Sequence, residues 1–118
     1  MAHPLGEIAT SRAAESTNKT PLLLSSWATT DVYEVNQAAP NCYKMFQIYM
    51  SKVKEVNLDV WQKVKQNGFK VMCLTTDTQH LGKRESDVRN RFQLPNHLTL
   101  AVYEKYRSKS KTQEINKS

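Results

Sequence analysis

Basic side chains near the carboxyl end are the first residues in this sequence whose chemistry suggests a function. Between residues 83 and 111, eight Lys and Arg residues stand against three acidic residues, a local excess of five positive charges. Clustered cations attract phosphate-rich surfaces. We therefore predict a small, basic, non-catalytic binding protein that contacts RNA or DNA with little sequence specificity, through Lys83, Arg84, Arg89, Arg91, Lys105, Arg107, Lys109 and Lys111.

Two other interpretations fit the same charges. They can form a solvated surface without a dedicated partner, or they can attract an acidic protein or an anionic membrane face. Two short helices that meet at Leu94-Pro95-Asn96 would form only a generic two-helix unit. The second of them lacks, at its start, the Arg, Asn and Gln residues that read base edges. Any contact with nucleic acid is therefore predicted to rest on phosphates.

A second function, from a different class, is a small accessory or inhibitory protein that docks on another protein, with a homodimer as one form. The aromatic and Met residues between Tyr43 and Met50 exceed what one short helix must bury. Exposed apolar helix faces are typical of docking surfaces. This alternative stays open beside nucleic-acid binding.

Cysteine and histidine could supply a metal site or a nucleophile. Cys42, Cys73, His80 and His97 are 31, 7 and 17 positions apart. Zinc sites usually contain closely spaced ligand pairs, and this set has none. A thiol can be activated by a neighbouring imidazole, but neither cysteine has a recognisable flanking motif. The three glycines do not form a phosphate-binding loop. We therefore expect no enzyme, no metal and no cofactor.

Length and composition indicate one domain. The chain has 118 residues and a net charge of +6. Its longest apolar runs, Val71–Leu74 and Leu100–Tyr103, are far shorter than the ~20 residues that span a bilayer. No signal peptide is recognisable at the amino terminus, so we expect an intracellular protein of the cytoplasm or nucleus. In a reducing compartment the two cysteines are expected to be buried thiols rather than a disulfide.

The sequence pattern predicts that these residues are positioned by a mostly helical α+β fold with about four short helices and one or two strands. Residues 1–20 are expected to form a flexible tail, residues 21–107 a single globular domain, and residues 108–118 a basic flexible tail. Asp31 and Glu34 have the spacing of a capping box, which predicts a helix over Val32–Ala39.

Apolar residues at three- and four-residue intervals predict the strongest helix from Cys42 to Val56. A further helix from Leu58 is favoured to end at Asn67-Gly68, where a hairpin turn is the alternative. Phe69–Thr75 is expected to be a buried strand, and Pro21–Trp27 a strand or an extended arm.

Beyond the predicted strand, residues 75–82 are expected to form a loop. Helices are predicted over Asp87–Gln93 and from Leu98 to Tyr106. The predicted core consists of Val32, Val35, Phe46, Tyr49, Met50, Val53, Trp61, Val64, Val71, Leu74, Phe92, Leu98 and Val102.

Overall fold

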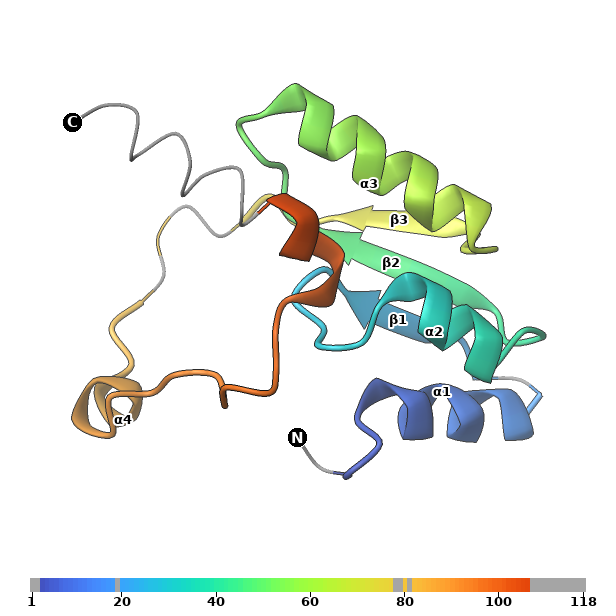
Figure 1. Ribbon diagram of the computed structural model, residues 1–118. Helices are drawn as coiled ribbons and strands as arrows, with labels where there is room; N and C mark the ends of the chain where they lie inside the picture. The colour runs from blue at the N-terminus through green and yellow to red at the C-terminus, as the bar shows by residue number, and fades with distance from the viewer. Residues whose placement is uncertain (1–2, 19, 78–79, 81, 107–118) are drawn as a thin grey trace.

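Three parallel strands alternate with helices in the computed structural model, which describes residues 3–18, 20–77, 80 and 82–106 (Figure 1). Strands β1 (Leu22–Ser25), β2 (Lys44–Ile48) and β3 (Val71–Leu74) form one sheet in the order β1-β2-β3. Helix α2 (Val32–Ala38) connects β1 to β2, and α3 (Lys54–Gln66) connects β2 to β3. Parallel neighbours require such crossovers, so the chain forms two successive βαβ units.

The two faces of this sheet differ. Leu22, Leu24, Phe46 and Ile48 are buried, and they form one core with Val32 and Val35 of α2 and with Val60 and Val64 of α3. The alternating residues of β1 and β2 point to the opposite face. There Leu23 is exposed, and Met45 and Gln47 are half-buried.

Helix α1 (Glu7–Ser16) corrects the expectation of a flexible tail over residues 1–20. It lies beside α2 in Figure 1. Ser11 and Ala14 are buried, and the Glu7 carboxylate accepts hydrogen bonds from Thr29 N at 3.3 Å and Thr30 Oγ1 at 2.6 Å. The segment gains order from these distant contacts, which its own sequence does not reveal.

The capping box at the start of α2 is confirmed. Tyr33 N donates to Asp31 Oδ1 at 2.9 Å, and Asp31 N donates to Glu34 Oε2 at 3.1 Å. The helix ends at Ala38, one residue before the predicted end. Local hydrogen bonds decide this element, so its sequence is sufficient to predict it.

The predicted helix from Cys42 to Val56 is wrong. Strand β2 occupies Lys44–Ile48, with buried and half-buried residues in alternation. A strand inside a parallel sheet is apolar on both faces, so its residues also satisfy a helical spacing by chance. The cysteine that was expected to open a helix therefore precedes a strand.

The helical interpretation of the next segment is confirmed, since α3 ends at Gln66. Asn67 caps its carboxyl end, and Gly68 follows with φ +77°. A hairpin at this turn would make its strands antiparallel, whereas β3 pairs in parallel with β2. Strand β3 covers the central part of the predicted strand Phe69–Thr75, and β1 lies within Pro21–Trp27.

The last described segment leaves the sheet and returns to it. Helix α4 (Glu85–Arg89) projects from the body of the molecule, and the short 3-10 helix η1 (Ala101–Tyr103) packs back against the β1 side (Figure 1). Ala101 N donates to Ala28 O at 3.3 Å, and Val102 is only 1% exposed. Helix α4 is shorter than the helix predicted over Asp87–Gln93, whereas residues 101–106 are helical within the helix predicted from Leu98 to Tyr106.

The predicted fold class and part of the predicted core need correction. The alternation of helices with parallel strands replaces a mostly helical fold. Val32, Val35, Phe46, Val64 and Val102 are buried as predicted. Six other members of the predicted core are exposed: Met50, Val53, Trp61, Val71, Leu74 and Phe92.

Candidate active site at the carboxyl ends of the strands

Polar side chains gather where the three parallel strands end. Ser25 and Ser26 stand at the end of β1, Gln47 lies near the end of β2, and Thr75 directly follows β3. We call these four residues the carboxyl-edge cluster. Ligand and active sites of parallel α/β folds lie at this edge, because all strands deliver side chains to it.

Gln47 lies at the centre of the cluster. Its Oε1 accepts hydrogen bonds from Ser25 Oγ at 3.3 Å, Ser26 N at 3.3 Å and Ser26 Oγ at 3.4 Å. Its Nε2 donates to Thr75 Oγ1 at 2.8 Å. One side-chain amide therefore links all three strands, and its two ends have fixed, different partners.

The backbone supports the same geometry. Ser26 N donates to Gln47 O at 2.9 Å, and Thr75 N donates to Ile48 O at 3.0 Å. Sheet pairing sets Ser25 opposite Gln47 in the register of β1 and β2. The cluster is thus placed by rigid strands rather than by a free loop, which favours a precise arrangement of ligand-binding groups.

Two aromatic rings follow the same strand ends. The ring centroids of Trp27 and Tyr49 are 5.3 Å apart, with their planes tilted by 41°. Trp27 is 54% exposed although it contacts Tyr49. An exposed ring beside hydrogen-bonding groups can pack against a ligand that has both apolar surface and polar atoms.

Tyr103 reaches the cluster from η1. Burial raises the pKa of the Tyr103 phenol, and the Ser26 side chain lowers it by a smaller amount. Tyr103 also lines a cavity of about 530 Å³ between residues 94–100 and the end of the described chain. Ser26 itself has no exposed surface.

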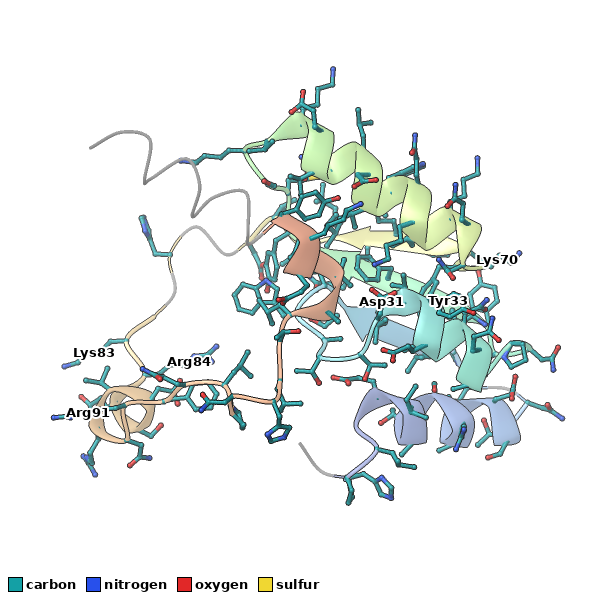
Figure 2. All side chains as sticks on the ribbon, in the orientation of Figure 1. Asp31, Tyr33, Lys70, Lys83, Arg84 and Arg91 are labelled. Atoms are coloured by element: carbon teal, nitrogen blue, oxygen red, sulfur yellow. The ribbon has the colours of Figure 1, made fainter. Side chains whose placement is uncertain are left out.

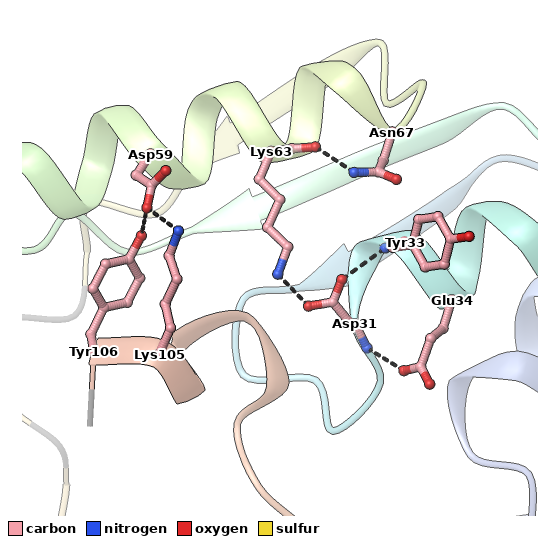
Figure 3. Close-up of polar contacts among 8 residues, drawn as sticks. All are labelled: Asp31, Tyr33, Glu34, Asp59, Lys63, Asn67, Lys105 and Tyr106. Atoms are coloured by element: carbon pink, nitrogen blue, oxygen red, sulfur yellow. Dashed lines mark hydrogen bonds and ion pairs between the residues drawn. The ribbon is translucent and has the colours of Figure 1, made fainter. Parts of the chain in front are cut away.

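Two ion pairs connect helix α3 to other segments of the chain (Figure 3). Lys63 of α3 pairs with the capping residue Asp31, which joins α3 to the start of α2. Asp59 of α3 binds Lys105 and Tyr106, which follow η1. The contacts with Lys105 and Tyr106 lower the pKa of Asp59. Both ion pairs therefore join α3 to segments that are distant from it in the sequence.

The cations singled out in the sequence do not meet at this edge. Lys83, Arg84 and Arg91 flank α4, away from the sheet (Figure 2). Arg89 ends the same helix, and Arg84 lies 3.9 Å from Asp87. Lys105 instead pairs with Asp59. Arg107, Lys109 and Lys111 lie outside the described residues.

The cysteines and histidines also stay apart. Cys42 is buried before β2, and Cys73 is a half-buried residue of β3. Within the described ranges, no group of three His, Cys, Asp or Glu side chains could hold a metal ion. No described helix is both long and apolar enough to cross a membrane.

The sequence analysis missed Ser26, Gln47 and Thr75 as functional candidates. The usable signal was a polar residue at or just beyond the end of each apolar segment. It could be recognised only once the segment around Phe46 was known to be a strand, since parallel strands bring their ends together.

Comparison with known proteins gives a consistent result. The family model for FMN-dependent dehydrogenases matches residues 1–117. Glycolate oxidase 3 of Oryza sativa subsp. indica is 47% identical over 104 residues, which are 88% of this chain and 28% of that protein. Glycolate oxidase of Spinacia oleracea is 46% identical over the same shares. The chain thus spans about 28% of the length of these curated relatives.

Solved structures agree with the fold. A lactate oxidase of Pediococcus acidilactici superposes with a TM-score of 0.83 at 29% identity, over 91% of this chain and 29% of the other. A soluble mutant of (S)-mandelate dehydrogenase from Pseudomonas putida gives a TM-score of 0.77 at 31% identity, over 86% of this chain and 28% of the other. The parallel βα units are therefore of the TIM-barrel-like type found in these enzymes.

These matches overturn the functional expectations. The predicted class, a non-catalytic protein that binds nucleic acid, is wrong, and so is the expectation of no enzyme, because the family and the similar proteins are oxidoreductases. The net positive charge did not predict the function, because net charge bears on partners and solubility rather than on fold or chemistry. The chain belongs to the FMN-dependent dehydrogenase family.

Proposed function

We propose that this chain supplies part of the flavin- and substrate-binding edge of an oxidoreductase that acts on 2-hydroxy acids. The observation that carries the proposal is Gln47, which is held at the carboxyl ends of all three strands by hydrogen bonds on both ends of its amide. The family is FMN-dependent, and the similar proteins are named for glycolate, lactate and mandelate, which are all 2-hydroxy acids.

The residues at this edge fit a flavin. Its ring system is planar and has carbonyl oxygens and ring nitrogens along one side, which require both donors and acceptors. Gln47, Ser25 and Thr75, none of which is fully buried, offer an amide and two hydroxyls, all of which can donate and accept. The exposed Trp27 ring offers apolar surface beside them. These are the side chains that would hold the ring.

Bound FMN would supply the two-electron acceptor for oxidising the hydroxyl-bearing carbon of the substrate to a carbonyl. The chain's own residues contribute binding, orientation and shielding from water. Gln47 is already fixed, so little conformational freedom is lost when a ligand binds to it. The Trp27–Tyr49 pair would cover one side of the bound groups and exclude water from them.

A titration of the full chain with FMN, followed by flavin fluorescence, tests the proposal. We expect saturable quenching, and we expect Gln47→Ala to weaken binding about 10-fold or more, because the flavin and the neighbouring hydroxyls lose a hydrogen-bond partner. Gln62→Ala on the exposed side of α3 is the matched control and should bind like the unchanged chain. Equal affinity in all three proteins would contradict the assignment of Gln47.

A second measurement addresses the substrate class. Glycolate, lactate or mandelate is added without oxygen to the FMN-loaded chain, and bleaching of the flavin absorbance band is recorded. Bleaching supports an oxidoreductase of 2-hydroxy acids. Tight FMN binding without bleaching by any of the three would restrict this chain to a flavin-binding role.

A further inference from the structure

The loop between β1 and α2 carries Trp27, and the start of this loop is tied to its surroundings. Trp27 N donates to Ser25 Oγ at 3.1 Å, and Ala28 N donates to Ser25 O at 3.0 Å. Ala28 is buried, and its carbonyl accepts from Ala101 N of η1 at 3.3 Å. The backbone beside Trp27 is therefore fixed, although the Trp27 side chain itself is largely exposed.

Glu7, in the first turn of α1, holds the other end of this loop. Its carboxylate accepts hydrogen bonds from Thr29 N at 3.3 Å, from Thr29 Oγ1 at 3.2 Å and from Thr30 Oγ1 at 2.6 Å. An ionised carboxylate has two acceptor oxygens, so it can bind both threonines at once. Hydrogen bonds to a charged acceptor are stronger than those between neutral groups. Helix α1 thus fixes a loop that lies 22 positions further along the chain.

We propose that Glu7 is a positioning residue that holds Trp27 against Tyr49 by fixing the backbone at Thr29 and Thr30. Thr29 follows Trp27 by two residues, so a backbone held at Thr29 restricts where the Trp27 ring can lie relative to the Tyr49 ring, 5.3 Å away between centroids. The importance of this ring pair for ligand binding rests on the proposed function, whereas the effect of Glu7 on Trp27 does not.

A second carboxylate of α1 supplies the comparison that makes this role testable. Glu15 Oε1 accepts from Asn41 N at 2.6 Å, in the turn before β2. This contact also attaches α1 to a distant loop, but at the amino ends of the strands rather than at the carboxyl-edge cluster. If both carboxylates only dock α1, losing either has the same consequence. A positioning role predicts that only the loss of Glu7 affects Trp27.

The first readout is the indole NMR signal of Trp27 in the flavin-free full chain, with the indole signal of Trp61 on α3 as the internal reference. We expect Glu7→Ala to shift the Trp27 signal and to weaken the nuclear Overhauser contact between Trp27 and Tyr49, with Trp61 unchanged. Glu15→Ala should leave both indole signals in place. An unshifted Trp27 signal in Glu7→Ala, or an equal shift in Glu15→Ala, would overturn the proposal.

A milder pair of variants keeps the test decisive if an alanine variant does not fold. Glu7→Gln retains one acceptor oxygen for the threonine donors and loses the charge, so it should shift the Trp27 signal in the same direction as Glu7→Ala but less. Glu15→Gln is its control and should not shift the signal. A Trp27 signal that is identical in Glu7→Gln, Glu15→Gln and the unchanged chain would refute the positioning role.

FMN affinity is the second readout. A ligand that needs Trp27 in one place binds in proportion to the fraction of molecules that present the ring there. If the loss of the Glu7 carboxylate lowers that fraction to between about a tenth and a third, Glu7→Ala raises the FMN dissociation constant about 3- to 10-fold. Glu15→Ala should leave the dissociation constant unchanged. An effect of Glu15→Ala equal to that of Glu7→Ala would contradict the assignment.

The Trp27→Ala background tests the route. If Glu7 acts through Trp27, Glu7→Ala should change the FMN dissociation constant by less than about 2-fold once the indole ring is absent. The same 3- to 10-fold loss in that background would overturn the route. A shifted Trp27 signal in a chain that does not bind FMN would uphold the positioning role and contradict the proposed function. An unshifted signal together with tight FMN binding would do the reverse.

Discussion

Replacing Lys44 with methionine should cost a substantial part of the stability of this chain. Lys44 lies in β2 and is only 1% exposed. Its Nζ donates to Ala39 O at 2.7 Å, to Pro40 O at 3.1 Å and to Cys42 O at 3.2 Å. These carbonyls belong to the turn between α2 and β2, so one ammonium group holds the end of a helix and the start of a strand together.

The expected magnitude follows from burial. Ala39 and Cys42 are buried, so their carbonyls lose their Lys44 partner and have little access to water, whereas the exposed Pro40 can be hydrated. Ala39 O still accepts from Cys42 N at 3.4 Å, so only the buried Cys42 carbonyl is left without a donor, which costs about 1–3 kcal/mol. Removing the desolvated ammonium offsets part of this, since an isolated buried charge is unfavourable. We expect a net loss of about 1–2 kcal/mol.

Urea unfolding of the full chain measures the free energy of unfolding from the midpoint and the slope of the transition. Lys52→Met, at an exposed position, is the control and should change stability by no more than about 0.5 kcal/mol. Lys44→Met should move the midpoint with little change in slope. If it proves as stable as the control, the Cys42 carbonyl has another donor available and the reasoning about this turn is wrong.

Three further predictions concern the elements around the site. Burial alone would raise the pKa of Glu7, but its hydrogen bonds, with that from Thr30 the strongest, outweigh burial and lower the pKa below 4.5. The stabilisation from its carboxylate is therefore present above pH 4.5 and is lost as pH falls through the lowered pKa. Glu7→Gln should be less stable than the unchanged chain at neutral pH, and its free energy of unfolding should fall less in acid. Parallel pH profiles of the free energy of unfolding would refute this. Asp31→Ala should lower the free energy of unfolding in urea by about 1–2 kcal/mol, because α2 loses its cap and Lys63 loses its ion-pair partner. Asp31→Asn should recover part of this loss, because asparagine can cap the helix without a charge. Gly68→Ala should cost about 1–2 kcal/mol, since φ is +77° there, and an unchanged midpoint would show that the turn relaxes.

The sequence by itself determined the elements that depend on neighbouring residues. The Asp31 and Glu34 spacing defines the start of α2, because both hydrogen bonds of the capping box lie within four residues. The Asn67-Gly68 pair marks the end of α3, because glycine tolerates the left-handed conformation that follows the helix. Strand β3 follows from a short run of apolar residues after this turn.

Only the tertiary structure determined that Lys44–Ile48 forms strand β2, that Glu7–Ser16 forms helix α1, and which residues make up the site. Phe46 and its neighbours have a spacing that suits a helix or a buried strand equally, and parallel pairing with β1 and β3 selects the strand. Gln47, Ser26 and Thr75 lie far apart in the chain, and they become one cluster because parallel strands end at one edge. Positive charge was visible in the sequence, but the geometry that suits a flavin arises from contacts between distant segments, which composition and local spacing do not encode.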